Sequence, residues 1–426
     1  MSACRVCAGE RLELVLDLGD QPHCNSLLDE AALARPEPRY PLRLFFCRDC
    51  TTVQIDHTVP KETMFGEYLY VSGTTATLRE HFRDSAERLT ERLELEPGDL
   101  VVDIGSNDGT WLRQFQAMGL RGLGVEPACN IAAIANADGV PTLNRFFNRE
   151  VAVEILDSET PRLVTAAGVF FHLEELHSAT EGVAEFCRHG AVFCVQAIYL
   201  AEMLRQTAFD NIYHEHLTYW TLRSISALLE RHGLEVFEAS VTSIHGGSLE
   251  LLIDERGSRP VGDSVHLLAE RERAEGIGEI ETYHRFTQRV AEIRGRLLAL
   301  LQDYRAREKV VYAFGAPAKG ATLLNSFGIT ADLVACATER NPLKVGRWIP
   351  GARLPIVEEG SVPDPDAYLV LPWNFLGEFL ERTREYVLRG GELVVPIPEP
   401  RVITAASSEF RAAQAPSPTR SRERRG

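Results

Sequence analysis

A short apolar run, a glycine turn and an acid at the end of a second apolar run occur together at 101–126 of this 426-residue chain. The segment opens with VVDIGSNDG and ends on Glu126. Glycines let the backbone come close to a ligand at a helix N-terminus, where N–H groups point outward. An acid at the tip of the next strand, about 20 residues further on, is placed to bond the hydroxyls of a ribose. The pattern therefore predicts a site for a nucleoside.

The spacing within this turn indicates which nucleoside is bound. A dinucleotide fingerprint needs G-x-G-x-x-G, and here Asn107 stands at the middle glycine, between Gly105 and Gly109. Asp103 at the strand end would repel a pyrophosphate but could pair with an ammonium. A ligand with a ribose and an ammonium but no phosphate is S-adenosylmethionine. The segment resembles motif I of the class I methyltransferases, and the predicted cofactor contacts are Asp103, Gly105, Asn107, Gly109 and Glu126.

Four of the nine cysteines form two C-x-x-C pairs near the start of the chain: Cys4, Cys7, Cys47 and Cys50. Four thiolates complete a tetrahedral zinc site and leave no open position for water, so the predicted Zn²⁺ is structural rather than catalytic. The ion should hold residues 1 to about 60 together, because so small a segment cannot rely on its hydrophobic core alone. His23 and Cys24 lie between the pairs and could compete as ligands, but they lack the C-x-x-C spacing.

The run Tyr213-His214-Glu215-His216 follows an apolar segment at 191–198, in the region where a doubly wound sheet places its active site. It is not a zincin motif, because H-E-x-x-H needs its histidines four apart on a helix. If the run is extended, His214 and His216 point to one side, and Tyr213 and Glu215 to the other. A histidine in such a cluster is a candidate base near neutral pH. The alternative is a polar network that only holds the loop.

Helical patterns alternate with apolar runs over the middle of the chain, which implies a parallel sheet with helices on both faces. Strands are predicted from 101 and at 120–125, 163–171, 191–198, 234–240 and 248–253, with helices at 76–95 and 174–187. A long helical pattern at 263–308 then leads to a second α/β region with its own glycine turn around Gly315. Its further strands are predicted at 332–337, 367–371 and 392–395.

These elements predict an α/β protein in four parts. They are a zinc-binding module at 1–70, a Rossmann-like class I methyltransferase core at 71–257, a C-terminal Rossmann-like α/β domain at 258–405 and a disordered tail at 406–426. The tail is assigned from its composition, which is rich in proline, serine and arginine.

The composition argues against several classes of partner. The formal net charge of −16 disfavours a nucleic-acid substrate, because phosphate binding needs a basic surface. No apolar run approaches the length of a membrane span, and the first residues do not resemble a secretory signal. We therefore expect a cytoplasmic protein with reduced thiols, no membrane attachment and no obligate protein partner.

The order of the motifs is similar to that of the nucleotide-sugar C-methyltransferases that build branched deoxysugars for bacterial natural products. After the cysteine pairs, VVDIGSNDG, GVEP and YHEH come HGGS at 245–248 and then AFGAPAKG, NPLKVGRWIPG and LPWNF. Within this family the chain most resembles the 3-C-methyltransferases that act on dTDP-4-keto-deoxyhexoses. The resemblance extends over nearly all of the chain, up to about residue 405.

The resemblance implies a substrate, two cofactors and a set of site residues. The substrate is a dTDP-linked 4-keto-deoxyhexose, and the cofactors are S-adenosylmethionine and zinc. His216 corresponds to the base that removes the C3 proton, whereas Tyr213 and His172 are placed to stabilise the oxyanion of the enolate. Glu215 would orient a histidine or bind the sugar. The implied substrate contacts are Tyr68, Tyr70, His245, Lys319 and Lys344. For each lysine, a solvated surface charge is the alternative.

Two positions depart from the family pattern. The strand before His172 begins at Thr165 and reads TAAGVFF where an asparagine is usual, and Gln196 stands where an acid is common. No residue decides between an amino and a hydroxyl group at C3. One alternative function is an NAD-dependent nucleotide-sugar oxidoreductase or epimerase that uses the turn around Gly315. Another is a zinc-bearing binding module with an inactive core, which the intact glycine turn and YHEH run argue against.

Overall fold

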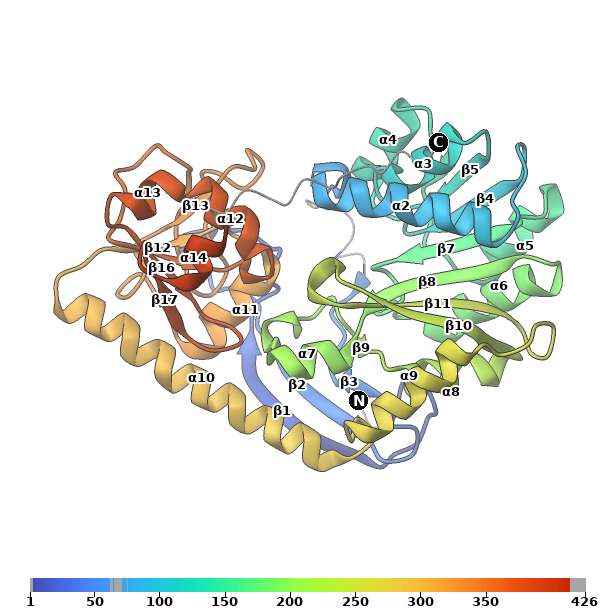
Figure 1. Ribbon diagram of the computed structural model, residues 1–426, viewed down its shortest axis with the longest axis horizontal. Coiled ribbons are helices and arrows are strands. Elements are labelled where there is room, and N and C mark those ends of the chain that lie inside the picture. The colour runs from blue at the N-terminus through green and yellow to red at the C-terminus, as the bar shows by residue number, and fades with distance from the viewer. Residues whose placement is uncertain (1–2, 62–63, 65–70, 75, 414–426) are drawn as a thin grey trace, which may run out of the picture. The chain divides into compact units, whose positions relative to one another are not determined.

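A computed structural model of the protein describes residues 3–61, 64, 71–74 and 76–413. The chain forms two compact units: Met1–Asn25 with Pro38–Arg289, and Ser26–Glu37 with Val290–Gly426 (Figure 1). Most of the predicted zinc module and the predicted methyltransferase core belong to the first unit. The second unit takes Ser26–Glu37 from the module and continues from Val290, inside a helix. Tyr68 and Tyr70, two of the predicted substrate contacts, lie outside the described residues.

The zinc module of the first unit contains a four-stranded antiparallel sheet in the order β1-β2-β3-β9. Its strands are β1 (Leu12–Gln21), β2 (Tyr40–Cys47), β3 (Val53–Ile55) and β9 (Thr218–Tyr219). The last strand follows the YHEH run in sequence, and it pairs Tyr219 with Val53 and Thr218 with Gln54. Because all four of these residues are buried, this pairing ties the YHEH run to the zinc module.

The methyltransferase core is a seven-stranded sheet in the order β10-β11-β8-β7-β4-β5-β6. The parallel strands are β4 (Leu100–Ile104), β5 (Arg121–Val125), β6 (Thr142–Leu143), β7 (Leu163–Ala167) and β8 (Val192–Ile198). The predicted closing strands form the antiparallel pair β10 (Leu234–Thr242) and β11 (Ser248–Glu255). The strand order reverses at β4, and open sheets bind their ligands beside such a reversal, at the carboxyl ends of the strands.

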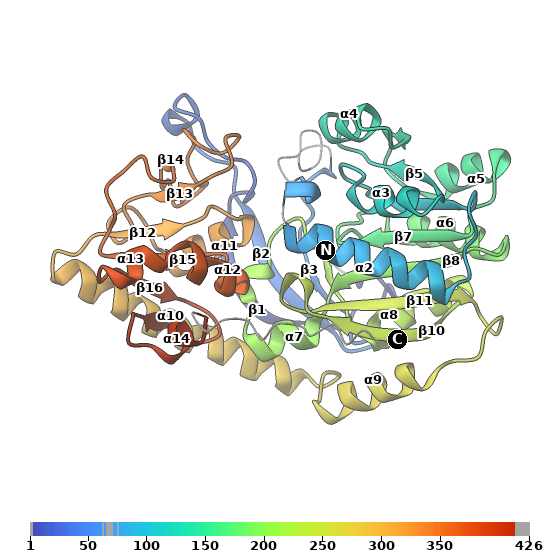
Figure 2. The ribbon, with the colours of Figure 1, turned by 45° about the horizontal axis from the view of Figure 1, so that its top comes forward.

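Helices pack around this sheet (Figure 2). They are α2 (Ala76–Arg92), α3 (Thr110–Ala117), α4 (Cys129–Ala137), α5 (Arg149–Ser158), α6 (Leu176–Arg188), α7 (Leu200–Gln206), α8 (Leu222–Leu229) and α9 (Asp263–Ala274). In α2, Leu78, Phe82 and Leu89 recur at helical spacing and are buried. Phe82 stacks on Trp111 of α3 with ring centroids 5.0 Å apart, which fixes the helix that follows the glycine turn.

The second unit is built on a six-stranded sheet in the order β14-β13-β12-β15-β16-β17, with β17 antiparallel to β16. Its strands are β12 (Val311–Phe314), β13 (Ala337–Glu339), β14 (Ile356–Glu358), β15 (Ala367–Val370), β16 (Glu392–Val395) and β17 (Arg401–Ile403). Its helices are α11 (Ala318–Phe327), α12 (Leu376–Arg382), α13 (Arg384–Leu388) and α14 (Ser408–Ala413), and α10 (Ile280–Ala306) crosses the division between the units.

Two details of the second unit differ from the prediction. The strand predicted at 332–337 begins only at Ala337, and the buried Val334 and Cys336 lie in the loop that precedes it. The segment predicted to be disordered from 406 onward contains α14, which is anchored by the buried ring of Phe410. A polar composition did not indicate this single apolar anchor.

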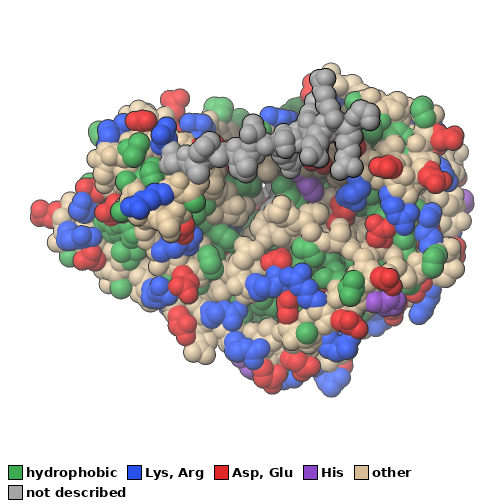
Figure 3. Space-filling model, viewed as in Figure 1, with side chains coloured by type: hydrophobic (Ala, Val, Ile, Leu, Met, Phe, Trp, Pro, Cys, Tyr) green, Lys and Arg blue, Asp and Glu red, His purple; other side chains and the backbone are tan. Residues whose placement is uncertain are grey.

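The charged residues on the face shown in Figure 3 are interspersed, with acidic and basic side chains as neighbours. The excess of 16 negative charges is therefore not gathered into one patch on that face. Among the described helices, none is long and apolar enough to cross a membrane.

Candidate active site and zinc centre

The glycine turn at the end of β4 needs glycine at two positions. Gly105 has a φ of 66°, and a Cβ there would lie 2.3 Å from the side chain of Val169. Gly109 has a φ of 74°, and its Cβ would lie 2.8 Å from Val140. Side chains are excluded at both positions by conformation and by space, so the backbone can reverse tightly before α3. The turn predicted from the sequence is therefore present.

Two buried acids face this turn. The carboxylate of Glu126, at the end of β5, accepts the N–H groups of Asn107 (3.0 Å) and Ala128 (2.8 Å). Asp103 accepts the hydroxyl of Thr165 over 2.7 Å. Burial raises the pKa of Asp103 to about 7, with the nearby charge of Glu126 adding to the effect, and burial raises the pKa of Glu126 as well. Within the described part of the chain no cation neutralises either acid, so the site suits a ligand that carries positive charge and hydroxyl groups.

The four predicted zinc ligands come together at the other end of the first unit. The Sγ atoms of Cys4 and Cys50 are 3.5 Å apart, those of Cys7 and Cys47 are 3.6 Å apart, and all four lie within 4.8 Å of one another. The amide N–H groups of Val6 and Gly9 point at Cys4 and Cys7, each over 3.4 Å, which favours thiolates. Four sulfur ligands at this spacing fit a closed tetrahedral zinc site.

The YHEH run forms a turn and is not extended, so its side chains do not alternate as they would in a strand. The amide of His216 donates to the carbonyl of Tyr213 over 2.9 Å, which brings the first and fourth residues to one side. The rings of Tyr213 and His216 lie 3.8 Å apart between centroids. His214 points elsewhere and packs on Tyr40, where burial lowers the pKa of its imidazole to about 4. The turn therefore separates the two histidines.

His216 and His172 lie beside each other, with ring centroids 5.1 Å apart. Nδ1 of His216 donates to the carbonyl of Asn211 over 2.8 Å, and Nδ1 of His172 donates to the carbonyl of Glu215 over 2.6 Å. Because a carbonyl only accepts, Nδ1 carries the proton in the neutral ring of His216, and Nε2 is its basic nitrogen. The ring of His172 has a second backbone partner at Gly168. Burial lowers the pKa of His172, which favours its neutral form.

The two halves of the site meet at neighbouring strand ends. Val169, which follows β7, fills the space in front of Gly105, and its carbonyl accepts the amide of His172 over 2.7 Å. The strands β7 and β4 are direct neighbours in the sheet. The predicted base, its partner histidine and the glycine turn therefore lie at the same edge of the sheet, at the reversal in strand order.

Glu215 has two partners that the sequence did not assign to the site. Its buried carboxylate lies 3.0 Å from Nε2 of His23 and accepts the side-chain amide of Asn25 over 2.6 Å. Burial would raise the pKa of Glu215, but the bond from His23 and the charges of His23 and His172 outweigh it, so the pKa is lowered. The only sequence signal for this contact is the position of His23 and Cys24 between the cysteine pairs. That position indicates possible metal ligands and does not indicate a contact with Glu215.

Three further predicted residues are described by their local surroundings. Lys319 and Lys344 belong to the second unit, near its glycine turn. Nζ of Lys319 lies 4.3 Å from the ring centroid of Trp373, and Nζ of Lys344 donates to the carbonyl of Ala316 over 2.9 Å. His245 lies in a short 3₁₀ turn between β10 and β11.

At both positions that depart from the family pattern, a side chain forms hydrogen bonds with its neighbours. Thr165 holds Asp103, as described above. Gln196 donates to Glu250 over 2.5 Å and bonds to His81 of α2 over 2.9 Å. Glu250 is its register partner on β11, so an acid occupies the neighbouring strand at this level of the sheet.

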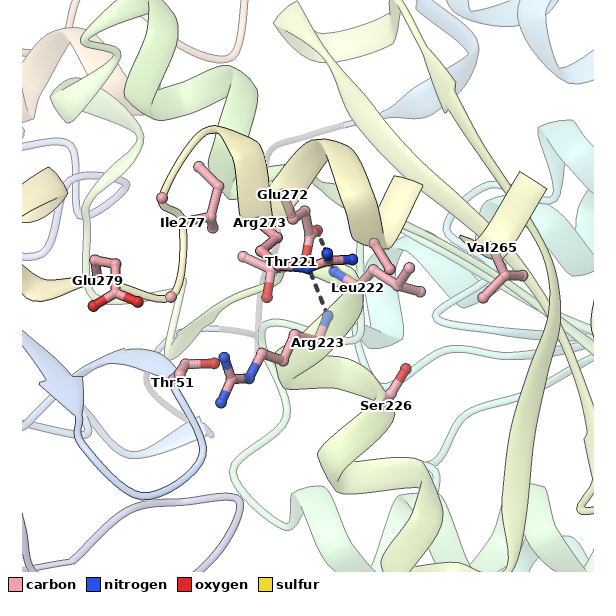
Figure 4. A pocket seen from close by; sticks show the side chains of 13 residues that line it. Thr51, Thr221, Leu222, Arg223, Ser226, Val265, Glu272, Arg273, Ile277 and Glu279 are labelled. Atoms are coloured by element: carbon pink, nitrogen blue, oxygen red, sulfur yellow. Dashed lines mark hydrogen bonds between the residues drawn. The ribbon is translucent and has the colours of Figure 1, made fainter. Parts of the chain in front are cut away.

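A cavity of about 370 Å³ lies elsewhere in the first unit, between α8, α9 and the turn at 276–279 (Figure 4). Its buried acid, Glu272, accepts the backbone N–H groups of Leu222 (2.6 Å) and Arg223 (3.2 Å) at the start of α8. This carboxylate caps the helix. None of the predicted catalytic or cofactor residues lines the cavity, so we place the active site at the sheet edge instead.

The fold and the site define a class of protein. A doubly wound sheet with an antiparallel closing pair, a two-glycine turn after its central strand and an acid after the next strand together describe a class I S-adenosylmethionine-dependent methyltransferase. Here the core carries a four-cysteine zinc module and a second α/β unit.

Comparison with known proteins narrows the class. Three family models match: a zinc binding domain at 4–65, a methyltransferase domain at 78–239 and a C-methyltransferase C-terminal domain at 243–398. The chain is 35% identical over 409 residues to the C-methyltransferase NovU of Streptomyces niveus, covering 95% of this chain and 97% of that protein. The chain therefore belongs to this zinc-bearing C-methyltransferase family and uses S-adenosylmethionine. This membership favours methyl transfer over the NAD-dependent alternative.

Solved structures resemble part of the chain. The magnesium protoporphyrin IX methyltransferase ChlM of Synechocystis with bound S-adenosylmethionine has a TM-score of 0.31 at 14% identity, covering 41% of this chain and 78% of its own. An S-adenosylmethionine-dependent methyltransferase of Clostridium acetobutylicum has a TM-score of 0.34 at 10% identity. The match covers 42% of this chain and 92% of that protein.

Proposed function

We propose that this C-methyltransferase acts on a small-molecule substrate, a dTDP-linked 4-keto-deoxyhexose, and adds a methyl group to its C3. The observation that carries the proposal is the packing of Tyr213, His216 and His172 at the strand edge beside the cofactor turn. A ketone at C4 acidifies the proton on C3, so a single positioned base can form the enolate. S-adenosylmethionine, when bound, supplies an electrophilic methyl group.

In this proposal Nε2 of His216 takes the C3 proton. The carbonyl of Asn211 holds Nδ1–H of His216 and also stabilises the imidazolium that forms, because it accepts a bond from a ring that has become positive. The phenol of Tyr213 donates to the oxygen at C4 as negative charge develops there. The C3 carbon then forms the new bond to the methyl group while the methyl–sulfur bond breaks and its electron pair stays on sulfur, and the carbonyl at C4 is restored.

The role of His172 depends on its protonation. The ring of His172 bonds to the carbonyl of Glu215 through Nδ1–H and has a second backbone partner at Gly168. A neutral ring has only one N–H and therefore none to spare for an oxyanion. As an imidazolium it can donate, and the charge of Glu215 favours that form against the effect of burial. We therefore propose that an ionised Glu215 is required for His172 to assist Tyr213.

Glu126 and Asp103 are proposed to hold the methyl donor, through the ribose hydroxyls and the ammonium respectively. Lys319 and Lys344 are proposed to contact the pyrophosphate of the nucleotide sugar. Both lysines flank the start of α11, where a helix N-terminus favours anions.

The test is incubation of the purified protein with labelled S-adenosylmethionine and a panel of dTDP-4-keto-deoxyhexoses. The panel includes substrates with an amino group and with a hydroxyl group at C3. We expect a product whose new methyl carbon is attached to C3 by NMR. If no member of the panel is methylated, or if the methyl group is on oxygen or nitrogen, the proposal is wrong.

Cofactor affinity should depend on pH through Asp103. The pKa of this carboxyl is raised to about 7 by burial, so it is increasingly protonated below that pH and must lose a proton before it can pair with an ammonium. The affinity for S-adenosylmethionine should therefore fall as the pH drops below about 7, by up to about tenfold per pH unit. Calorimetric titration in buffers of different ionisation enthalpy measures both the affinity and the proton release.

The matched control is Asp103→Asn, which keeps the shape and removes the titration. It should bind more weakly at pH 8 and lose the dependence below about 7. If the variant retains the same pH dependence as the unchanged protein, the titrating group is not Asp103.

A further inference from the structure

The loop that follows β1 brings polar side chains from the zinc module to the active-site turn. His23 is 5% exposed and Glu215 is 1% exposed, and Nε2 of His23 lies 3.0 Å from Oε1 of Glu215. The side-chain amide of Asn25 donates to the same oxygen over 2.6 Å. These contacts join residues about 190 positions apart in sequence, within one compact unit. One carboxylate oxygen thus accepts a hydrogen bond from Asn25 and lies at ion-pair distance from His23.

The other side of Glu215 faces the proposed catalytic groups. Its backbone carbonyl accepts Nδ1–H of His172 over 2.6 Å, and its neighbours in the turn are joined by the bond from the His216 amide to the Tyr213 carbonyl. A single residue therefore connects the zinc module, through its side chain, to the proposed base and its partner histidine, through its backbone. A rotation of this residue would displace the partners on both sides.

We propose that His23 and Asn25 are positioning residues for methyl transfer: by holding the carboxylate of Glu215 they fix the turn that carries Tyr213 and His216, and the ring of His172. The inference rests on the proposed function, since it assumes that these three residues act on the substrate. It also assigns the zinc module a part in the reaction beyond stability. A misplacement of about 1 Å at such a centre can cost about 100-fold in rate.

A bound metal ion is the alternative explanation for the cluster of His23, Cys24 and Glu215. The ligand atoms of His23, Cys24 and Glu215 lie within 4.8 Å of one another and are buried. A cation there would be repelled by the amide N–H of Asn25, which points at the same carboxylate oxygen as His23. An amide donor on this oxygen suits a carboxylate anion, so we assign a hydrogen bond from Asn25 and an ion pair with His23 rather than metal coordination.

The test compares His23→Ala with His23→Gln. We expect His23→Ala to lower kcat by about 10- to 100-fold, with little change in KM for the sugar, in the affinity for S-adenosylmethionine or in the zinc content of one equivalent. His23→Gln should recover most of kcat, because its amide nitrogen can reach the position of Nε2. His57→Ala is the matched control: it removes another histidine of the same module that stacks on Tyr40, and it should leave kcat within about twofold.

A double variant separates positioning from general damage. If His23 acts through Glu215, His23→Ala with Glu215→Gln should be no slower than Glu215→Gln alone. Losses that multiply would overturn the inference, as would a His23→Ala protein with unchanged kcat. A second equivalent of bound metal that disappears in His23→Ala would overturn it in favour of coordination.

A readout without turnover keeps this inference separate from the proposed function. In protein with ¹³C-labelled histidines, His23→Ala should shift the imidazole signals of His172 and His216, assigned from His172→Gln and His216→Gln, and His57→Ala should leave them in place. Unshifted signals contradict the positioning role whatever the substrate is. Shifted signals in a protein that methylates no member of the sugar panel would overturn the proposed function. They would still support the link from His23 to the rings of His172 and His216.

Discussion

Replacing His216 by glutamine should lower kcat for C3 methylation by about 10²- to 10⁴-fold, the range expected for removing a general base. Glutamine cannot take a proton at the position of Nε2, so the enolate would have to form by transfer to water. The affinity for S-adenosylmethionine should change little, because the ring of His216 packs on Phe171 in the loop after β7, whereas the cofactor is proposed to contact the glycine turn. Steady-state kinetics and calorimetric titration of the same preparation measure the two quantities.

His214→Gln is the control, since it changes a histidine of the same turn. His214 packs on Tyr40 and its pKa is lowered to about 4, so it is neutral at working pH and faces away from His216. Its replacement should keep kcat within about tenfold and act mainly on stability. A loss of turnover in His214→Gln together with an active His216→Gln would mean that the roles of the two histidines are exchanged.

Replacing Cys47 by serine should unfold the first module and abolish turnover. Structural zinc contributes on the order of 10–16 kcal/mol in small zinc-binding peptides, which exceeds the stability of many whole domains. Cys47 is fully buried at the end of β2, so a weakly bound or absent ion would leave the surrounding loops without their cross-link. Because β9 pairs with β3, we expect the loss of order to reach the Tyr213–His216 turn.

Metal content, thermal denaturation and activity measure this outcome together. Cys336→Ala is the matched control: it removes a buried cysteine of the second unit that is not part of the four-sulfur cluster. It should retain one equivalent of zinc and full cofactor binding, with a small loss of stability. A Cys47→Ser protein that keeps stoichiometric zinc and an unchanged melting temperature would show that the ion is held elsewhere.

The features predicted correctly from the sequence depend on short stretches of chain. The turn at 105–109 needs positive φ at two glycines, which is a property of those residues and their neighbours. Each C-x-x-C pair forms its own half of the zinc site, with Val6 and Gly9 donating to the first two thiols. The closing strands were also recognisable, because their apolar runs are long enough to identify.

The errors arose where residues distant in sequence decide the outcome. The conformation of the YHEH run cannot be predicted from its own four residues, because its turn is held between Asn211, β9 and the loop after β7. The start of β13 and the presence of α14 depend on which apolar side chains pack against the rest of the fold. Local composition does not contain that information.

The sequence by itself determined the chemistry that is available: a turn for S-adenosylmethionine, four thiolates for zinc, and a tyrosine and histidines within a few residues of one another. Only the tertiary structure decided how these groups act. It turned His214 away and brought His216 to Tyr213 and His172, and it joined His23 to Glu215 across the chain. The physical reason is that a residue type sets which protons and ligands a side chain can exchange, whereas burial and neighbours set its orientation and charge, and these neighbours come from separate elements of the fold.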